Sequence, residues 1–206
     1  MSANITKLTV MLEMQHAMNT KVHENWFEQG FEWYRAIWVE CAEMLDHYGW
    51  KWWKKQTPDV EQVILELVDI FHFGLSLRID GKTSFATLAE GLAAELAAPT
   101  QAQDFKATLE LLAAAAVADK AFDAHAFAGC MAQIGMDLDD LYRGYVGKNT
   151  LNFFRQDHGY KDGSYIKVWD GKEDNEHLMD VVKALDTNHA DFAKQVYAGL
   201  QARYPA

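Results

Sequence analysis

The residues best suited to chemistry in this sequence are four carboxylates arranged as two pairs. Glu40 and Glu43 lie in the motif ECAE, and Glu66 and Asp69 lie in the motif ELVD. This spacing places the members of each pair one turn apart on one face of a helix. Carboxylate oxygens are the ligands that Mg²⁺ and Mn²⁺ prefer, and magnesium keeps several waters that substrate phosphates can replace. The four residues are therefore candidate metal ligands and candidate catalytic residues.

The helix expected to carry the second pair has little other polar surface. It contains VILELVDIFHF, whose apolar side chains cover nearly the whole circumference of a helix. Glu66 and Asp69 therefore point into the protein or into a cleft, where an unpaired charge is costly. The segment GWKWWKKQTP is short enough to make the two helices antiparallel neighbours, so the two acidic pairs can face each other. Like charges at that distance repel unless they are protonated or bridged by cations.

A simpler interpretation is that these acids line solvated faces. It is reasonable for Glu43, which shares a strip of its helix with other charged residues. It is weaker for Glu66 and Asp69, because their helix is otherwise almost entirely apolar. His72 lies just beside the polar line of that helix, and we interpret it as a core or rim histidine rather than a ligand.

Hydrophobic periodicity and scarce proline predict an all-α fold. Pro58, Pro99 and Pro205 fall between or after the periodic segments, and strand patterns are nearly absent. We expect a single domain over residues 1–206, built as a helical bundle in which antiparallel helices carry the paired acidic motifs. The expected helices span residues 5–22, 25–48, 58–79, 84–98, 102–118, 123–134, 137–156, 174–185 and 189–204.

The composition excludes several classes of protein. A chain of 206 residues with 50% hydrophobic and 13% aromatic content has a sizeable core and is not disordered. The formal net charge of −11 argues against a nucleic-acid or membrane surface as the main partner. There is no apolar run of about 18 residues and no signal-peptide pattern, so we expect a soluble, cytoplasmic protein. Cys41 and Cys130 lack CxxC spacing and are expected to be reduced and buried.

A basic, aromatic segment near the C-terminus is the candidate anion site. Residues 143–172 contain six Lys or Arg against three Asp. Lys148, Asn152 and Arg155 share one face of the predicted helix, and Lys167 follows in a long irregular loop. The cationic side chains can donate charge-assisted hydrogen bonds to phosphate oxygens. A solvated basic face explains the same residues, although the aromatic content of the loop favours an ordered lid.

Two carboxamides near the N-terminus could read a nucleobase. Gln15 and Asn19 lie on an apolar helix face, where their polar atoms need partners. An amide offers both a donor and an acceptor, which can match the edge of a uracil, and Trp52 or Trp53 could stack on the ring. Hydrogen bonding to the backbone within the core is the alternative explanation.

In combination, these motifs resemble one enzyme family. In chain order, MLEMQHAMN, ECAE, WKWW, ELVD and GKNTLNFFRQDHGYKDGSYIKVWDGKEDN are similar to motifs of the dimeric, all-α dUTP diphosphatases, metal-dependent enzymes unrelated in fold to the trimeric β-barrel dUTPases. The acidic motifs are shared with the wider all-α NTP pyrophosphatases, including the MazG-like group, whereas the C-terminal run is far more specific. The resemblance covers most of the chain. The Ala-rich helical region around residues 86–136 matches no motif and is where members of this family vary.

The resemblance implies hydrolysis of dUTP, and also of dUDP, to dUMP and pyrophosphate or phosphate by a homodimer that uses Mg²⁺, with Mn²⁺ as a substitute. This reaction limits uracil incorporation into DNA. One glutamate of the ECAE motif would orient or deprotonate the attacking water. The implied metal ligands are Glu40, Glu43, Glu66 and Asp69, and the implied substrate contacts are Gln15, Asn19, Trp52, Lys148, Asn152, Arg155, Tyr160 and Lys167. Asn175 in the EDN motif is either a further substrate contact or a helix cap.

Two other functions stay open at this point. A related all-α pyrophosphatase that acts on dCTP or on non-standard nucleotides would share the acidic motifs, because the base-reading residues are the least specific part of the match. A catalytically silent helical protein that binds metal or nucleotide is the third interpretation. No nucleic acid and no membrane are expected as partners.

Overall fold

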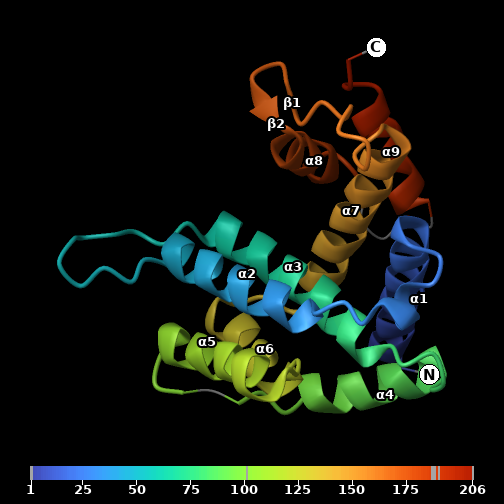
Figure 1. Cartoon of the computed structure of the whole chain (residues 1–206). Helices are drawn as coiled ribbons and strands as arrows, with labels where there is room; N and C mark the ends of the chain where they lie inside the picture. Colours follow the sequence, from blue (N-terminus) through green and yellow to red (C-terminus); the bar gives the residue numbers. More distant parts are fainter. Residues whose placement is uncertain (1, 101, 187–188, 190, 206) are drawn as a thin grey trace. The chain divides into compact units, whose positions relative to one another are not determined.

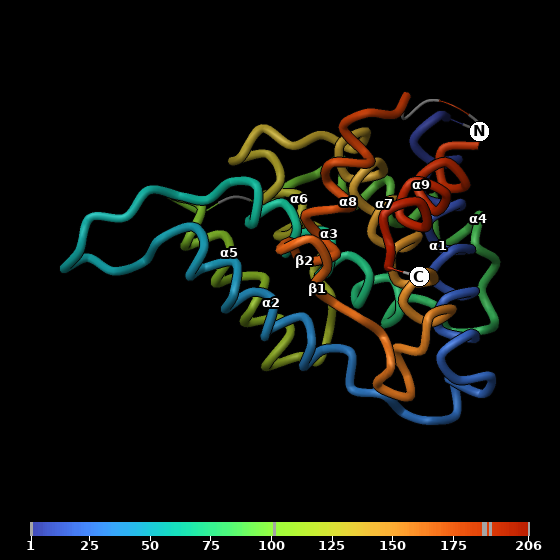
Figure 2. Tube along the Cα trace, turned by 90° about the horizontal axis from the view of Figure 1, so that it is seen from above, coloured from blue at the N-terminus to red at the C-terminus, as the bar shows by residue number. Residues whose placement is uncertain are grey.

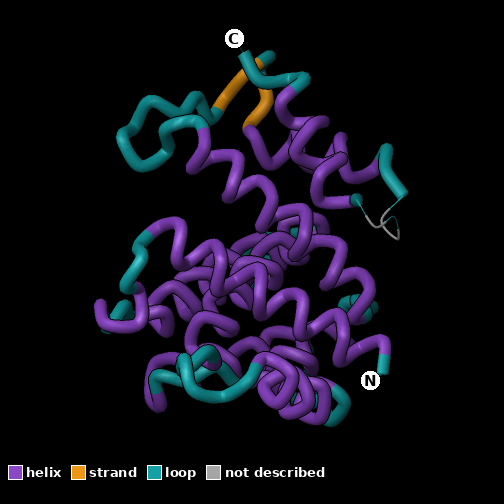
Figure 3. The backbone as a smooth tube through the Cα atoms, turned by 90° about the vertical axis from the view of Figure 1, so that its right-hand side faces the viewer, coloured by secondary structure: helices purple, strands orange, loops and turns teal. Residues whose placement is uncertain are grey.

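The computed structural model describes residues 2–100, 102–186, 189 and 191–205, and these residues are mostly helical (Figures 1 and 3). The helices are α1 (Ala3–Val22), the 3-10 helix η1 (Trp26–Gln29), α2 (Trp33–Tyr48), α3 (Val60–Arg78), α4 (Phe85–Leu96), α5 (Phe105–Ala114), the π-helix η2 (Ala115–Asp119), α6 (Ala124–Gln133), α7 (Leu138–Asp157), α8 (Asp174–Lys183) and α9 (Phe192–Gln201). Two short antiparallel strands, β1 (Val168–Trp169) and β2 (Lys172–Glu173), form the one sheet in these ranges. The predicted all-α fold is confirmed.

The chain divides into two compact units, which are described separately below. Unit 1 spans Met1–Tyr142 and holds α1 to α6 with the start of α7, and unit 2 spans Arg143–Ala206 and holds the rest of α7 with β1, β2, α8 and α9. The single domain expected over residues 1–206 stays a prediction. Within the described residues, no helix has the length and apolar character needed to cross a membrane.

In unit 1, α2 and α3 lie side by side as antiparallel neighbours, and the connection of residues 49–59 projects away from them (Figures 1 and 2). The apolar face of α2 is buried at Ile37, Cys41 and Met44, and α3 buries many more side chains, including Leu67 and Ile70. Burying such side chains stabilises the pair by about 1.5–3 kcal/mol each. This packing fixes the face on which the acidic motifs meet.

The two cysteines are reduced and buried, as the sequence predicts. Cys41 and Cys130 are both free and buried. Burial raises the pKa of the Cys130 thiol to about 12, so this thiol is protonated at neutral pH. Cys41 has a similarly raised pKa, chiefly because of burial. Neither thiol is poised for nucleophilic chemistry.

Most helix bounds agree with the sequence pattern within a few residues, but one predicted helix is wrong as a single element. The helix predicted over residues 25–48 is interrupted because Gly30 adopts a left-handed φ of 61° after η1, and α2 begins only at Trp33. Glycine adopts this conformation without a steric penalty, so the glycine in FEQGFEW was the missed signal. The helix predicted over residues 102–118 is continuous from Phe105 to Asp119, and its end is the π-helix η2. In the last predicted helix, Ala190 lies outside the described residues.

In unit 2, the loop that follows α7 is held in place by contacts with α8 and with Tyr204. Trp169 is buried and stacks on His177 of α8 with ring centroids 4.5 Å apart. His177 Nε2 lies 2.9 Å from the Trp169 carbonyl oxygen, and Ile166 N donates to Tyr204 Oη at 2.9 Å. These contacts explain why strands of two residues form in a segment whose sequence shows no strand pattern.

Packing around α3 generates a testable prediction. A methyl group at Gly74 would lie 2.7 Å from the Phe122 ring, whereas one at Gly91 on α4 would meet nothing within 4 Å. We expect Gly74→Ala to lower the free energy of unfolding by about 1–3 kcal/mol, because the ring must move. Gly91→Ala should raise it by up to about 1 kcal/mol, because only the glycine entropy cost is removed. Chemical denaturation measures both, and equal effects would contradict the packing described here.

Candidate active site

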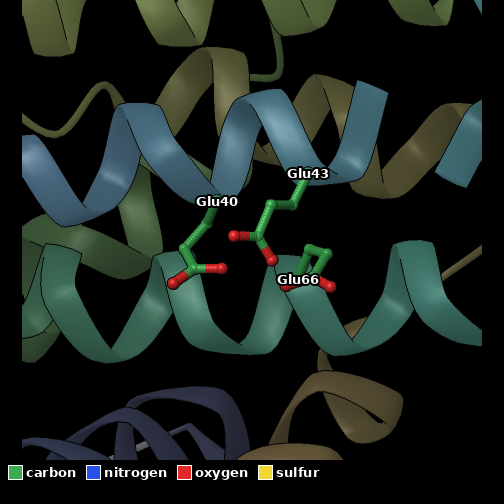
Figure 4. A group of neighbouring side chains, drawn as sticks. All are labelled: Glu40, Glu43 and Glu66. Carbon is green, nitrogen blue, oxygen red and sulfur yellow. The ribbon is translucent and has the colours of Figure 1, made fainter. Parts of the chain in front are cut away.

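Three of the four predicted metal ligands converge between α2 and α3 (Figure 4). Glu40 and Glu43 extend from α2 toward Glu66 on α3, and one ligand atom of each residue lies within 4.8 Å of the others. Glu66 is buried, Glu40 is half-buried and Glu43 is exposed. Asp69 does not belong to this close group, but its charge is near enough to raise the pKa of Glu40.

Glu40 shows the electrostatic consequence of this crowding. Its pKa is raised to about 8, first by burial and then by a hydrogen bond with Glu66 and by the charges of Asp69, Glu66 and Glu43. A proton on Glu40 therefore relieves the repulsion near neutral pH, and a divalent cation would relieve it in the same way. The ligand set consists of carboxylate oxygens, which fits Mg²⁺ or Mn²⁺.

A histidine that the sequence analysis missed borders the carboxylates. His47 Nε2 lies 3.5 Å from Glu66 Oε1. Glu40, Glu43 and His47 follow an i, i+3, i+7 spacing, which places them on one face of α2. That spacing in ECAEMLDH was the available signal. An imidazole at this position can orient a ligand carboxylate through its ring N–H group.

The two predicted base-reading amides form a buried polar cluster with side chains of α3. Gln15 Nε2 donates to Asn19 Oδ1 at 2.9 Å and to Ser76 Oγ at 3.0 Å. Asn19 Nδ2 also donates to Ser76 Oγ, and His72 Nδ1 lies 2.7 Å from Gln15 Oε1. The amides therefore do not rely on the backbone alone. Asp69, His72 and Ser76 are spaced i, i+3, i+7, so one face of α3 carries an acidic residue of the ELVD motif and the two residues that contact the amides of α1.

The aromatic residues of the α2–α3 connection face solvent. The exposed fraction is 89% for Trp52 and 57% for Trp53, and their rings meet edge-to-face with centroids 5.4 Å apart. Trp52 therefore keeps an indole face that could stack on a planar ring. The structure gives it no contact with the amide cluster, so its role in base binding stays a prediction.

Unit 2 holds the predicted phosphate contacts. Lys148, Asn152 and Arg155 lie on α7, and Asn152 Oδ1 accepts a hydrogen bond from Arg155 Nη1 at 3.2 Å. Lys148 is buried, although a solvated basic face would expose it. The Arg155 guanidinium carbon lies 5.8 Å from the centre of the Tyr160 ring. Three of the predicted contacts, Asn152, Arg155 and Tyr160, therefore form one local group.

The last two predicted contacts lie at the start of α8 and in the loop before it. Asn175 is not the helix cap, because Glu173 occupies the N-cap position and Asn175 falls within the first turn. Its Oδ1 atom is buried and has no hydrogen-bond partner among the described residues, so it can accept from a ligand. Lys167 pairs with Glu173 at 3.1 Å on the exposed side of the loop.

The raised pKa of Glu40 predicts how the metal-free protein responds to pH. The folded state binds this proton more tightly than the unfolded state, whose value is near 4.5, so stability falls as the pH rises from about 4.5 to about 8. We expect Glu40→Gln to raise the metal-free Tm at pH 8 by about 2–4 °C, a value discounted for partial exposure. Thermal unfolding in a chelator measures this. A larger gain at pH 5 than at pH 8 would contradict it.

Comparison with known proteins adds a separate line of evidence. A family model described as dUTPase matches residues 7–160. The matched range contains the amide cluster, the acidic residues and the α7 contacts, and it ends before Lys167 and Asn175. A search of curated proteins finds no match to the chain.

Proposed function

The chain belongs to the all-α, dimeric dUTPase family, and from this premise we propose that it hydrolyses dUTP, and also dUDP, to dUMP with release of pyrophosphate or phosphate. Membership makes the chain a dUTP diphosphatase, a metal-dependent hydrolase with a nucleotide substrate. The observation that carries the proposal is the convergence of Glu40, Glu43 and Glu66 within 4.8 Å. Consumption of dUTP in the cytoplasm would limit uracil incorporation into DNA.

In this proposal, Glu40, Glu43, Glu66 and Asp69 hold Mg²⁺, for which Mn²⁺ can substitute. When bound, such an ion makes a water more acidic, neutralises phosphate charge and aligns the nucleophile with the leaving group. A carboxylate of the ECAE pair orients the attacking water and accepts its proton. His47 holds the carboxylate of Glu66 in its binding orientation.

The polar residues of unit 2 are proposed to bind the phosphate chain. Lys148, Arg155 and Lys167 supply cationic donors, and each charge-assisted hydrogen bond is worth about 1.5–3 kcal/mol. Asn152 and Tyr160 complete the set, and both lie beside the Arg155 guanidinium. The remaining contacts are proposed to be Gln15, Asn19 and Trp52 for the base, with Asn175 accepting a hydrogen bond from the nucleotide.

A pyrophosphatase that acts on dCTP or non-standard nucleotides is the alternative, and the amide cluster is the reason to keep it. A carboxamide can turn over to exchange its donor and acceptor, so Gln15 and Asn19 could match either a uracil or a cytosine edge. Their bonds to Ser76 and His72 hold one arrangement in the free protein. We propose that this arrangement favours uracil.

Measuring the turnover of a panel of nucleotides tests directly which substrate the protein prefers. We expect Mg²⁺-dependent release of pyrophosphate from dUTP and of phosphate from dUDP, with kcat/KM for dCTP lower by about tenfold or more, because a mismatched edge leaves buried polar groups unpaired. Faster turnover of dCTP or of a non-standard nucleotide would favour the alternative. Absence of turnover with every nucleotide would favour a silent binding protein.

Glu66→Gln tests the acidic group. The substitution keeps the volume of the side chain and removes one ligand charge, so we expect kcat with Mg²⁺ to fall by at least about 100-fold while the circular dichroism spectrum is unchanged. Glu90→Gln on the exposed face of α4 is the matched control and should keep wild-type activity. Near-normal turnover by Glu66→Gln would remove Glu66 from the metal site.

We also propose that the protein is a homodimer, as the resemblance of its motifs to the dimeric dUTP diphosphatases implies. Phe27, Phe31 and Trp38 expose 43%, 41% and 42% of their surface around η1 and α2, which leaves apolar area for a second copy to cover. Trp38→Glu should shift the mass measured by light scattering toward the monomer. Leu111→Glu, at a side chain of similar exposure on α5, should leave a dimer. A monomeric wild type at micromolar concentration would refute the proposal.

A further inference from the structure

The Arg155 guanidinium is held on two sides by residues of its own unit. Its Nε and Nη2 atoms donate to Asp174 Oδ2 at 2.7 Å and to Asp174 Oδ1 at 2.9 Å. Its Nη1 atom donates to Asn152 Oδ1 at 3.2 Å. A guanidinium carries more N–H groups than these contacts use, and the remaining ones lie on Nη1 and Nη2. The orientation of the group is therefore fixed while part of its donor edge is still available.

Asp174 is the centre of this arrangement. Its side chain is fully buried, and Oδ2 accepts a second hydrogen bond, from Tyr165 Oη at 3.0 Å. Burial acts to raise the pKa of Asp174, but the hydrogen bond and charge of Arg155 outweigh it and hold the pKa below its ordinary value. Asp174 is therefore ionised at neutral pH, and it forms a bidentate pair with Arg155.

The pairing changes how Arg155 can contribute to binding. The charges of Arg155 and Asp174 cancel at short range, so Arg155 adds little net positive charge to the basic segment. What it offers is a rigid set of N–H groups with a defined direction. Immobilising a long side chain before the ligand arrives avoids the entropy cost of ordering it in the complex.

We propose that Asp174 and Tyr165 are positioning residues that hold Arg155 so that its remaining Nη1 and Nη2 N–H groups are directed at the phosphate chain of the nucleotide. Asp174 acts on the guanidinium directly, and Tyr165 acts on Asp174. The inference rests on the proposed contact between Arg155 and phosphate. It assigns a role to two residues that the sequence analysis did not select, although both lie in the C-terminal run that resembles the family.

Arg155→Ala is a poor test of this arrangement. It would leave the Asp174 carboxylate buried without its cation, which destabilises a fold regardless of any role in binding. Changes in the partners of Arg155 are more informative, because they keep the guanidinium and alter only what holds it.

The experiment compares kcat/KM for dUTP in two variants and two matched controls. Tyr165→Phe removes one hydrogen bond and should lower kcat/KM by about twofold to tenfold, and Asp174→Asn should lower it by about tenfold to 100-fold. Tyr197→Phe and Asp180→Asn are the controls. Tyr197 Oη donates to Asp157 Oδ2 at 2.9 Å, and Asp180 pairs with Lys172 at 2.7 Å, so each control removes the same type of group from a more exposed interaction of unit 2 that does not involve Arg155. Both controls should keep wild-type kcat/KM.

A second readout separates positioning from general stability. In the folded wild type, the Nε–H resonance of Arg155 should be sharp and slow to exchange in nuclear magnetic resonance spectra, and Asp174→Asn should shift and broaden it while the circular dichroism spectrum stays helical. If Asp174→Asn does not fold, Tyr165→Phe measured against Tyr197→Phe decides the question. Wild-type kcat/KM in Tyr165→Phe, or in folded Asp174→Asn, would overturn this inference alone. Absence of dUTP turnover in the wild type would overturn the proposed function and this inference with it.

Discussion

Repulsion among the carboxylates of α2 and α3 is the main physical constraint on the candidate metal site of this protein. The apolar faces of the two helices hold Glu40, Glu43 and Glu66 within 4.8 Å of one another, even though burial and neighbouring charge raise the pKa of Glu40 to about 8. Hydrophobic packing beneath the acids offsets that repulsion. Acids held together at such a cost are explained if the group binds a cation, and the family to which the chain belongs is metal-dependent.

Unit 2 holds its charges in a different way. There, a half-buried cation is matched by a buried anion, since Arg155 and Asp174 form a bidentate pair that Tyr165 and Asn152 extend. In unit 1 several acids share one small region, whereas in unit 2 the charge of Arg155 is balanced by Asp174 and its guanidinium is oriented. Each arrangement suits a different ligand, because a cation needs excess negative charge and a phosphate oxygen needs directed N–H groups.

Sequence reasoning predicted the features that depend on local spacing. The acidic pairs, the antiparallel helices that carry them and most helix bounds follow from periodicity, and the family followed from motifs. The features that it missed depend on residues brought together from different elements. His47 on α2 lies beside Glu66 on α3, Gln15 on α1 donates to Ser76 on α3, and Arg155 on α7 donates to Asp174 on α8. The spacing of residues along one helix shows which of them share a face. It does not show which residues of other helices will contact that face.

Anomalous diffraction from crystals of the protein grown with Mn²⁺ tests the central claim most directly. We expect strong anomalous peaks within coordination distance, about 2.0–2.3 Å, of carboxylate oxygens of Glu40, Glu43 and Glu66, with Asp69 on the same ion or its neighbour. Occupied Mn²⁺ positions elsewhere on the protein, with none between α2 and α3, would contradict it.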